Sequence, residues 1–556
     1  MKEIEVYCKN NQTKTTYSNG TTLLEVANNQ QITLNSQVLG AYVNNELKGL
    51  IYEIYTPVTV EFIDISNPDG MRLYQRSLTF LLQKALKDIF PQHNLTVQHS
   101  VSKGLYCEIT DNGAELTITQ INKLEQYMQK LVADDIPFIR NKISTADAIK
   151  LFEANGFHEK VLLLKTRPRF YTSVYFLDGY ANHYYGPLVP STGYLKTFGL
   201  FSYYKGLLLM FPRSDEPNKL ENIIVQNKMF EIFQEHKEWN RILGAHSVGR
   251  INSAVENDKF GDLIKVNEAL HEKKYAAIAD AISQRPDVKI ILIAGPSSSG
   301  KTTTAKRIGL QLKVAGLNPV VISLDNYFVD RECTPKDKNG EYDFESIYAL
   351  DLNLLNEHLI NLLDGKTVLI PKFSFSSGMR YYDNENLTVG ISDILIIEGI
   401  HALNPKLTEH IENKYKFKIY VSALTSIALD NSNRISTTDN RLIRRIVRDA
   451  HNRSYSALDT IRRWQSVRRG ESKNIFPYQE NADIMFNSSL IYELSVLRFF
   501  VEPLLLKIPP TEQEYAEAVR LLKFISYFTQ ADRKDIKQIP PTSVLREFIG
   551  FSSFSY

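Results

Sequence analysis

The stretch Gly295-Pro-Ser-Ser-Ser-Gly-Lys301-Thr302 decides the fold of the second half of the chain. It follows Val288-Lys-Ile-Ile-Leu-Ile-Ala294, a short apolar run rich in β-branched residues, and precedes a helical pattern over 303–315 that ends at Gly316. A strand, a glycine-bounded loop and a helix in this order are typical of a phosphate-binding loop. The two glycines of the loop permit the tight turn that directs backbone N–H groups toward phosphate oxygens.

The residues of this loop predict a site for a nucleoside triphosphate, with ATP and Mg²⁺ as its ligands. Lys301 would place a positive charge near the β- and γ-phosphates, and Thr302 would offer a hydroxyl to Mg²⁺. A chance glycine-rich turn is the alternative, which the flanking strand and helix disfavour. The predicted ATP-binding residues of the loop are Gly295, Pro296, Ser297, Ser298, Ser299, Gly300, Lys301, Thr302 and Thr303.

Composition bounds the class of protein. A chain of 556 residues predicts roughly three domains. The 65 Lys and Arg residues nearly balance 63 Asp and Glu, so net charge does not indicate a nucleic-acid partner. Three widely spaced cysteines form no disulfide framework or metal knuckle. The first residues lack an apolar signal core, and no apolar run approaches the ~20 residues needed to cross a bilayer. We therefore expect a cytoplasmic protein without membrane contact.

Residues 1–66 read as a small β-rich module. Ile4-Glu-Val-Tyr7 and 56–63 alternate as strands do, a short helix follows Thr21 or Thr22 as its cap, and 41–50 reads as a hairpin around Asn44-Asn45. This pattern resembles the TGS domain, a ubiquitin-like β-grasp module at the start of threonyl-tRNA synthetases. The resemblance implies a β-grasp fold; an unrelated small α+β module is the alternative.

Residues 67–240 resemble the α+β editing domain of the same synthetases. The helical pattern over 71–90 matches the helix that carries the family's His-Ser-x-x-His metal ligands, and 183–196 matches its Cys-x-Gly-Pro-His-Val-Pro stretch. In this chain the four ligand positions hold residues without imidazole or thiolate, so they cannot build the family's zinc site. Those residues are Arg76, Phe80, Tyr184 and Leu188.

Other features of this region leave alternatives open. His93 and His99 could form an unrelated metal pair, but isolated histidines are more often surface or core residues. The aromatic run over 169–176 could stack bases, although aromatics at strand spacing more often belong to a core. We expect the N-terminal modules to be where RNA or a small ligand would bind, and the protein to be a homo-oligomer.

The rest of the chain reads as a helical linker over 241–286, a kinase domain over 287–500 and a C-terminal helical extension over 501–556. In the kinase segment, short apolar runs alternate with helices, which predicts a doubly wound parallel sheet. Ligands of such sheets gather at the carboxyl ends of the strands, where Asp325 and Glu398 follow apolar runs. Buried acids there indicate Mg²⁺ coordination or proton abstraction.

The motifs of the kinase segment resemble those of uridine kinases, which belong to the phosphoribulokinase/uridine kinase family. The match spans roughly 288–490 and occurs in the family's order. Its motifs are Ser323-Leu-Asp325-Asn-Tyr-Phe328, Tyr342-Asp-Phe344-Glu345, Pro371-Lys-Phe373-Ser-Phe375, Ile397-Glu398-Gly399 and Asp439-Asn-Arg441-Leu-Ile-Arg444-Arg445-Ile-Val-Arg448-Asp449.

The resemblance implies a role for each matched residue around the transferred phosphate. Asp325 would accept the proton of a 5′-hydroxyl, with Lys301 and Arg441 completing the catalytic set. Glu398 would join Thr302 at the metal. The resemblance also implies that Arg445 and Arg448 contact the ATP phosphates.

The helix that carries these arginines can also be read unaided. Arg441, Arg445 and Arg448 fall on one face of a helix over 438–452, with apolar residues on the adjoining face. A solvated basic face is the ordinary reading of such a pattern. Beside a phosphate-binding loop, a mobile arginine helix that closes over the triphosphate is favoured, because phosphoryl transfer needs positive donors.

The same resemblance implies a nucleoside pocket, with Glu345 at the ribose. Its residues would be Phe328, Phe344, Phe373 and Phe375, with Arg380 as a further donor. One departure concerns the base: Gly378 stands where uridine kinases carry a base-contacting His, and Ser374 replaces an acid. We therefore expect an ATP-dependent nucleoside kinase of nucleoside salvage, uridine kinase-like, whose base is not fixed by these residues.

Two other functions stay open at the sequence level. The same scaffold could phosphorylate another small hydroxyl metabolite. A nucleotide- or RNA-responsive regulator with a non-catalytic loop is the alternative from another class. Asp325 beside Lys301, Thr302 and Glu398 favours catalysis, because a pure switch needs no acceptor base.

Overall fold

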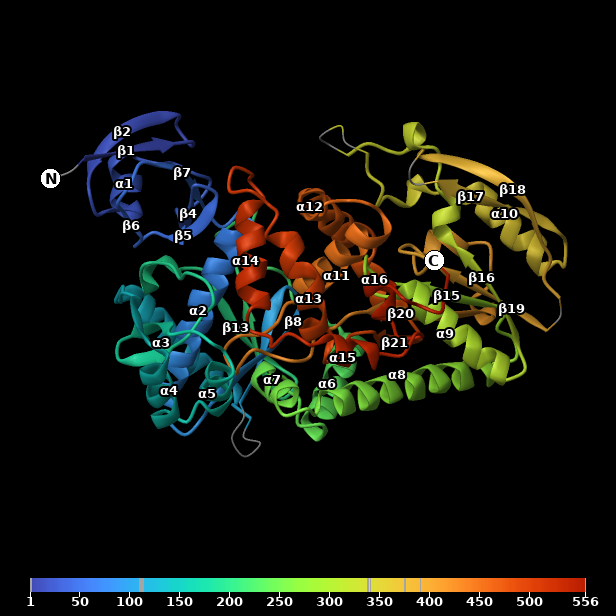
Figure 1. Cartoon of the computed structure of the whole chain (residues 1–556), viewed down its shortest axis with the longest axis horizontal. Coiled ribbons are helices and arrows are strands. Elements are labelled where there is room, and N and C mark those ends of the chain that lie inside the picture. The colour runs from blue at the N-terminus through green and yellow to red at the C-terminus, as the bar shows by residue number, and fades with distance from the viewer. Residues whose placement is uncertain are drawn as a thin grey trace.

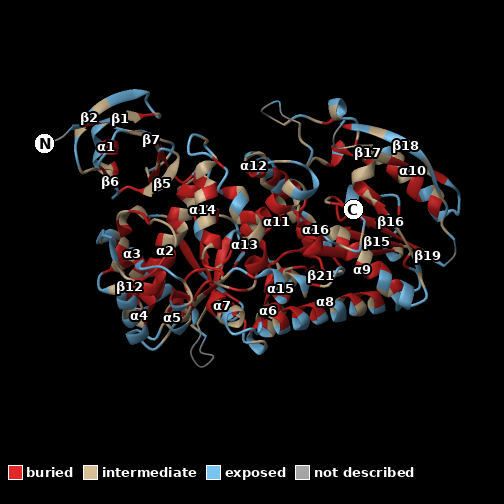
Figure 2. Ribbon diagram, viewed as in Figure 1, coloured by how far each residue is buried: buried red, intermediate tan, exposed pale blue. Residues whose placement is uncertain are grey.

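A computed structural model describes residues 3–109, 115–337, 340, 342–374, 377–390 and 392–555. Figure 1 shows a small β module at one end, the kinase sheet at the other and helices of the second half of the chain between them. Buried residues line the inner faces of all these parts (Figure 2). Within the described ranges, no helix combines the length and the hydropathy needed to cross a membrane.

The N-terminal module is a five-stranded mixed sheet in the order β2-β1-β7-β4-β5, covered by helix α1. Strands β1 and β7 are parallel and the other neighbours antiparallel, the arrangement of a β-grasp fold. The elements are β1 (Glu3–Cys8), β2 (Thr13–Ser18), β3 (Thr21–Thr22), α1 (Leu23–Asn29), β4 (Gly40–Val43), β5 (Glu46–Gly49), β6 (Glu53–Ile54) and β7 (Val58–Ile63).

Two local predictions for this module are confirmed. Thr22 caps α1 in a reciprocal capping box with Glu25. Asn44 and Asn45 join β4 to β5 with positive φ angles of 47° and 59°. Both central residues of a tight hairpin turn need this conformation, and asparagine adopts it more readily than most residues.

The second module packs two antiparallel sheets, β13-β14-β9-β8 and β10-β11-β12, around the long helix α2. Asn67 caps α2, and Pro68 occupies its first turn, where a missing N–H costs nothing. The elements are α2 (Pro68–Ile89), β8 (Leu95–Val101), β9 (Gly104–Ile109), α3 (Ile118–Ala133), β10 (Ile139–Ser144), α4 (Thr145–Ala154), α5 (His158–Lys165), β11 (Tyr171–Leu177), β12 (Tyr180–Asn182), β13 (Gly199–Tyr203) and β14 (Gly206–Met210).

Three of the four residues at the positions of the family's metal ligands, Phe80, Tyr184 and Leu188, are buried in the core of this module. The Phe80 and Tyr184 rings lie 5.6 Å apart, and Leu188 is buried beside them. Arg76 donates from Nε and Nη2 to the carbonyl of Pro187, at 3.1 and 2.9 Å. Apolar packing and a backbone hydrogen bond thus replace the coordination that imidazole and thiolate would supply.

The aromatic run over 169–176 enters strand β11, which is exposed at its start and mostly buried from residue 172 on. Tyr175 lies in the core, whereas Phe170 and Tyr171 are exposed. His99 is buried and stacks on Phe233 with ring centroids 3.9 Å apart, which places it in the core contacts between the second module and α6. The structure therefore favours the core interpretation for Tyr175 and His99.

Three helices lead into the kinase sheet: α6 (Asn227–Ile242), α7 (Val248–Glu256) and α8 (Phe260–Ser283). The segment predicted as a linker contains α7 and α8. Tyr275, Ile278 and Ile282 of α8 lie in one buried cluster with residues of the kinase sheet. Figure 2 shows α8 buried along one side and exposed along the other. This helix is therefore part of the packed structure rather than a free connection.

The kinase domain contains a five-stranded parallel sheet in the order β16-β19-β15-β20-β21, as the sequence predicts. The central strand β15 is fully buried and leads into the phosphate-binding loop. The elements are β15 (Ile290–Ala294), α9 (Lys301–Val314), β16 (Asn318–Ser323), α10 (Leu352–Leu363), β17 (Val368–Ser374), β18 (Met379–Leu387), β19 (Asp393–Glu398), β20 (Lys416–Ser422), α11 (Thr437–Asn452), α12 (Ala457–Asn474), β21 (Ile484–Asn487) and α13 (Glu493–Leu505).

The C-terminal extension contains α14 (Tyr515–Ile525), α15 (Arg533–Lys537) and α16 (Arg546–Ile549). Helix α14 begins after Glu514, whose side chain makes no capping hydrogen bond. Helix α14 contacts both N-terminal modules: Lys523 pairs with Glu46 at 3.1 Å, and Glu517 with Arg72 at 3.2 Å. The C-terminal extension therefore packs against both N-terminal modules.

A loop of the kinase domain, residues 424–436 between β20 and α11, is built into the second module. Its Asp430 forms a buried ion pair with Lys160 at 3.5 Å. Ser432 accepts a hydrogen bond from Gln83 at 3.1 Å, and Asn433 donates to the carbonyl of His183 at 2.9 Å. Breaking such a buried pair is costly, so the start of α11 is fixed by the second module.

Candidate active site

The phosphate-binding loop connects β15 to α9 by a turn that only small residues allow. A Cβ on Gly295 would lie 2.0 Å from the carbonyl oxygen of Val421 in the adjacent strand. Gly300 has a φ of 80°, and Ser298 a φ of 59°. Gly300 is the residue directly before α9, so the loop residues turn their backbone toward the N-terminus of a helix.

Two acids and a lysine meet at the carboxyl ends of the strands. Glu398 ends β19 and accepts hydrogen bonds from Ser323 Oγ at 2.9 Å and Thr302 Oγ1 at 3.4 Å. Asp325 follows β16 in a short 3-10 helix (Leu324–Tyr327). Burial lowers the pKa of Lys301, and the nearby charges of Glu398 and Asp325 oppose that shift.

The surroundings of Glu398 disfavour its charged form. Burial, and then repulsion from Asp325, raise the pKa of Glu398 to about 7. A carboxylate with two hydroxyl neighbours is a hard-oxygen donor set, the type that Mg²⁺ prefers. The residues at this position, Thr302 and Glu398, therefore fit the metal that the sequence predicts.

The arginine helix α11 runs directly over the loop. Arg441 donates to the carbonyl of Ser297 at 2.9 Å, and Arg445 to the hydroxyl of Ser297 at 2.8 Å. Arg448 pairs with Asp449 at 2.8 Å. Arg441 and Arg445 thus contact the loop, whereas Arg448 is held by an acid of its own helix.

The prediction of a mobile helix does not fit this packing. The apolar face of α11, including Leu442 and Ile446, is buried in the large cluster shared with α12, α13 and the C-terminal extension. The fixed loop before α11 adds a second anchor. The helix is therefore held as a wall of the site, because its apolar face and its first residues both have partners.

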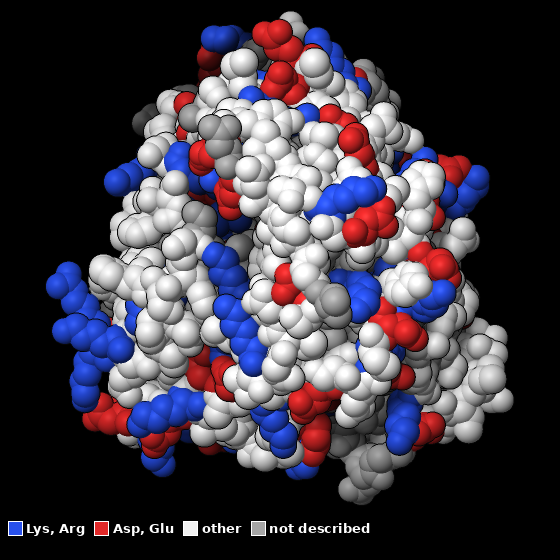
Figure 3. Space-filling view, turned by 90° about the vertical axis from the view of Figure 1, so that its right-hand side faces the viewer, with Lys and Arg blue, Asp and Glu red and all other residues white. Residues whose placement is uncertain are grey.

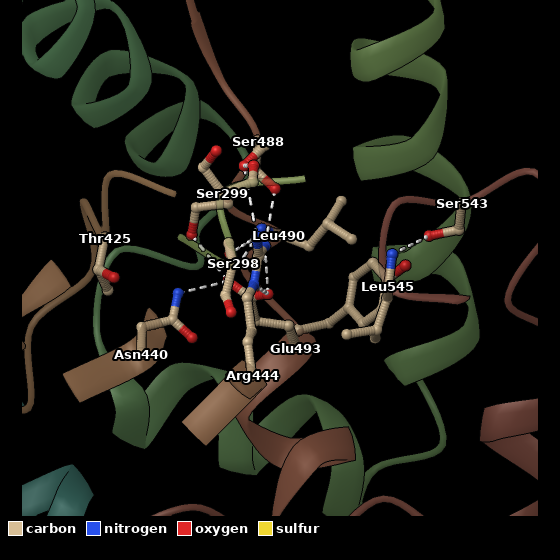
Figure 4. A network of polar contacts seen from close by, with 12 residues as sticks. Ser298, Ser299, Thr425, Asn440, Arg444, Ser488, Leu490, Glu493, Ser543 and Leu545 are labelled. Atoms are coloured by element: carbon tan, nitrogen blue, oxygen red, sulfur yellow. Dashed lines mark hydrogen bonds and ion pairs between the residues drawn. The ribbon is translucent and has the colours of Figure 1, made fainter. Parts of the chain in front are cut away.

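Arg444 lies outside the arginine face predicted from the sequence, and it is the most deeply buried arginine of α11. Its guanidinium is fully buried and donates to Glu493 at 2.7 Å, to the carbonyl of Ser488 at 2.8 Å and to that of Ser298 at 3.4 Å. Figure 4 shows this arginine at the centre of the network that supports the loop. A buried charge satisfied in this way positions the loop rather than a substrate.

The C-terminal extension also contacts the loop, which nothing in the local sequence indicates. A Cβ on Gly300 would lie 2.3 Å from Val544 Cγ2. Thr303, at the start of α9, donates to Glu547 at 2.6 Å. The start of α9 is therefore supported by contacts with residues 544–547 of the extension.

A third acid, Glu471 of α12, was missed at the level of sequence. It is buried, pairs with Arg441 and accepts the backbone N–H of Ser297 at 2.9 Å. Arg441 is thereby held in place by an acid rather than left in solvent. The sequence signal is an acid that directly follows basic residues in the second half of the helix, Arg468-Arg-Gly-Glu471.

Glu345, the predicted ribose carboxylate, lies against the same helix. Burial, and then the charge of Glu471, raise its pKa to about 7. Its Oε2 is buried without a hydrogen-bond partner among the described residues. A Cβ on Gly470 would lie 2.2 Å from the Cβ of Glu345, so the glycine permits this close approach. Buried carboxylate oxygens usually have donors, so this one is suited to accept from a ligand.

The predicted aromatic pocket is only partly assembled. Phe328 and Phe373 are neighbours, with ring centroids 5.5 Å apart. Phe344 instead lies next to Tyr342 at 5.9 Å and is 43% exposed. Phe375 lies outside the described residues. The structure thus brings two of the four predicted rings together.

The predicted donors near the base have partners within the fold. Arg380 binds Asp351 at 2.9 Å and the carbonyl of Phe328 at 3.2 and 3.1 Å. Arg380 therefore attaches the β17–β18 hairpin to the segments around Phe328 and Asp351. The sequence predicts, by contrast, a contact with the substrate for this side chain. A Cβ on Gly378 would lie 2.7 Å from the guanidinium of Arg331, so an arginine occupies the space beside the position of the family's histidine.

The surface at the kinase end of the molecule carries both signs of charge. Figure 3 shows Lys and Arg interspersed with Asp and Glu on this face. The view agrees with the near balance of charges in the whole chain. The basic groups that matter for phosphate are therefore those inside the site, on α9 and α11.

The second half of the chain has the features of a P-loop fold. These are a parallel sheet, a phosphate-binding loop after its central strand, and acids at the ends of the neighbouring strands. Residues 290–493 match the model of the "Phosphoribulokinase / Uridine kinase family". The model that matches is thus the one for the family that the motifs of this segment resemble.

Two sets of curated relatives match different parts of the chain. The threonine–tRNA ligase of Desulforamulus reducens is 30% identical over 205 residues, covering 37% of this chain and 32% of that protein. The match lies in the N-terminal part. The uridine kinase of Saccharomyces cerevisiae is 29% identical over 261 residues, covering 46% of this chain and 47% of that protein. The chain thus spans about a third of the length of these ligases and about half of the yeast kinase.

A solved structure from Bacillus stearothermophilus, described as a possible uridine kinase, is also similar to part of the chain. Its sequence identity is 18% and its TM-score 0.25, over 36% of this chain and 89% of that chain. The N-terminal resemblance to threonyl-tRNA synthetases and the kinase resemblance are both confirmed by the sequence matches.

Proposed function

We propose that the protein is an ATP-dependent nucleoside kinase that transfers the γ-phosphate to a nucleoside 5′-hydroxyl. The observation that carries this proposal is the meeting of Lys301, Asp325 and Glu398 at one edge of the sheet, beside the unpartnered carboxylate oxygen of Glu345. A regulator that only binds nucleotide needs the lysine but neither the acceptor base nor a carboxylate for a second substrate.

Each group has a role in this reaction. The loop N–H groups and Lys301 hold the β- and γ-phosphates, and Arg441, Arg445 and Arg448 surround them. Asp325 accepts the proton of the 5′-hydroxyl as the oxygen attacks, and bound Mg²⁺ would neutralise phosphate charge. Glu345 accepts hydrogen bonds from ribose hydroxyls, and Phe328 and Phe373 cover the base. Arg453 is an electrostatic neighbour of Asp325 and therefore a further candidate active-site residue, which the motifs did not indicate.

Several finer points belong to the same proposal. We assign residues 1–66, 67–240, 241–286, 287–500 and 501–556 to the β-grasp module, the editing-domain-like module, the helices before the kinase, the kinase domain and the extension. Uridine is the first candidate acceptor, with Arg331 near the base. The proposal also includes a cytoplasmic location and a homo-oligomeric state.

The decisive experiment measures ATP consumption by the full-length protein with each common nucleoside, ribulose 5-phosphate and pantothenate. Stimulation by a nucleoside, with a 5′-monophosphate as the product, supports the proposal. Stimulation by another hydroxyl compound alone would contradict a nucleoside acceptor and leave only the assignment of the kinase fold standing. If none of these compounds stimulates turnover, the regulator becomes the better function.

The pH dependence of acceptor binding tests Glu345. Because its pKa is raised to about 7, the carboxylate is protonated below that pH and becomes a weaker acceptor. We expect the KM for the nucleoside to rise as pH falls below about 7, and Glu345→Gln to raise KM roughly tenfold at pH 8 and to flatten the profile. The exposed acid Glu357 supplies a control, Glu357→Gln; an unchanged profile in Glu345→Gln would contradict the assignment.

Gly470 offers a test of the same contact from the other side. In a helix, Gly→Ala alone favours stability by about 1 kcal/mol. At this position the new Cβ would lie 2.2 Å from Glu345 Cβ and must displace it. We expect Gly470→Ala to raise the nucleoside KM about tenfold, with a smaller change in the KM for ATP. The control is Gly309→Ala in α9, where the nearest atom is 3.4 Å away; equal effects of the two variants would argue against the contact.

A further inference from the structure

A large cavity lies between the second module and the kinase domain. It is lined by Arg441 but not by Lys301, Asp325 or Glu398. Its volume is about 980 Å³, which is the size of a small-molecule site. One wall comes from α2 and β8, and the opposite wall from the loop before α11, from α11 itself and from α12. The cavity exists only because the two modules are fixed against each other.

The acidic side chains in the cavity wall already have partners. Asp439 binds Arg520 through two hydrogen bonds of 2.8 Å, and Glu221 pairs with Lys103 at 3.0 Å. Glu480 accepts the backbone N–H groups of 228 and 229 at 3.1 and 3.2 Å. Among the described residues of the wall, no acid is therefore left without a partner to pair with the remaining basic groups.

Three guanidinium groups in the wall lack an anionic partner. Among the described residues, Arg434 and Arg468 make no side-chain hydrogen bond or ion pair. Arg76 donates to a backbone carbonyl and lies over the ring of Tyr185, but it has no acid as a partner. Burial lowers the pKa of all three, because a buried charge without a counter-ion is unfavourable. Arg434 and Arg468 are both electrostatic neighbours of Asp439, so they border the same part of the cavity.

Neutral groups next to these arginines also lack partners. The hydroxyl of Thr425 and Nε2 of His99 are buried without a hydrogen-bond partner among the described residues. Burial lowers the pKa of His99 to about 3, so its ring is neutral at physiological pH. Buried polar atoms without partners are rare in proteins, and several of them around one cavity indicate a polar ligand.

We propose that this cavity binds a phosphorylated small molecule, with its phosphate between Arg434 and Arg468. Guanidinium groups match phosphate geometry through paired hydrogen bonds, and several of them compensate a doubly charged group. A polynucleotide is disfavoured, because these groups lie in a cavity walled by two modules rather than along an extended basic surface. The bound molecule would neutralise the charge that the wall leaves uncompensated.

The site is placed to affect the phosphate-binding loop. Arg441 lines the cavity and at the same time donates to Ser297 of the loop at 2.9 Å. A ligand beside Arg441 changes the charge that this arginine faces, so binding in the cavity and at the loop are expected to be coupled in both directions. The cavity would in this way link the second module to the kinase.

Calorimetric titration of the full-length protein tests the site directly. The probes are inorganic pyrophosphate, uridine 5′-monophosphate and ribose 5-phosphate, with uridine as the unphosphorylated control. The background is Lys301→Ala, which weakens phosphate binding at the loop. At least one phosphorylated probe should bind, and Arg434→Gln or Arg468→Gln should each weaken it about tenfold or more. Arg462→Gln, on the exposed side of the same helix as Arg468, should have no effect.

Thermal melting separates loss of the ligand from loss of the fold. Without a probe, Arg434→Gln and Arg468→Gln should melt at or above the temperature of the parent protein, because each removes an uncompensated charge. With the probe, the parent should gain stability and the variants should not. The proposal is overturned if no probe depends on these arginines, if the variants are destabilised without ligand, or if only an RNA oligonucleotide binds through them.

Discussion

Replacing Asp325 by asparagine is expected to lower kcat by roughly 10²–10⁴ while leaving ATP affinity nearly unchanged, the range for loss of a general base. The carboxylate lies beside Lys301 and Glu398 at the end of the sheet, where the acceptor hydroxyl must approach the γ-phosphate. An amide fills the same space but cannot take a proton, so the effect should fall on the chemical step.

The test measures kcat with saturating nucleoside and ATP, and the Kd of ATP by titration in the absence of the acceptor. Asp364→Asn, at the exposed end of α10, provides a matched control. Turnover near that of the wild type in Asp325→Asn would remove the base assignment. A large loss of ATP affinity in the same variant would instead indicate a metal-binding role.

Lys301→Ala is expected to abolish ATP turnover. Its side chain donates to the carbonyl of Pro296 at 3.2 Å and feels the charges of Glu398 and Asp325. In phosphoryl transfer, the lysine of such a loop is the charge that faces the transferred phosphate. Because the loop N–H groups and the arginines of α11 remain, the fold should persist while phosphate binding is weakened.

Turnover and ATP binding of Lys301→Ala should be compared with those of Lys313→Ala, an exposed lysine in the last turn of the same helix. Far-UV spectra and melting curves should be the same for both variants. Residual turnover above about a tenth of the wild-type rate in Lys301→Ala would show that the loop lysine is not needed for transfer.

The attachment of the kinase to the N-terminal modules changes how its arginine helix works. The loop before α11 is pinned through the buried Asp430–Lys160 pair, and the helix packs on three sides. A helix held in this way cannot close over a triphosphate as a free lid. Any closing motion must therefore come from other elements or from a joint movement of the modules.

Much of the fold followed from local patterns in the sequence. The strand, loop and helix around Gly295–Thr302 are encoded by an apolar β-branched run, by glycines that allow the turn and by a helical period, all within about one supersecondary unit. The parallel sheet followed from repeated short apolar runs, because strands covered on both faces are apolar on both faces. The Asn44-Asn45 hairpin and the α1 cap followed from turn and capping chemistry in the same local way.

The candidate site was predictable where a motif places a residue at a strand end. Lys301, Thr302 and Glu398 are examples, because each has a fixed position relative to its own strand or helix. Phe344 and Arg380 were predicted in the pocket from the motif alone, and the structure gives them other neighbours, Tyr342 and Asp351. Loop conformation decides such cases, and a short motif does not specify it.

The residues that support the phosphate-binding loop from distant parts of the chain were revealed only by the tertiary structure. Glu471 lies 174 residues from Ser297 in the sequence, and Glu547 lies 244 residues from Thr303. Arg444 has the same residue type as its neighbours on α11 and differs from them only in what packs around it. The cavity beside Arg434 and Arg468 likewise depends on how two modules meet. A local pattern carries the conformation of its own segment, whereas burial and pairing between distant segments depend on the packing of the whole chain.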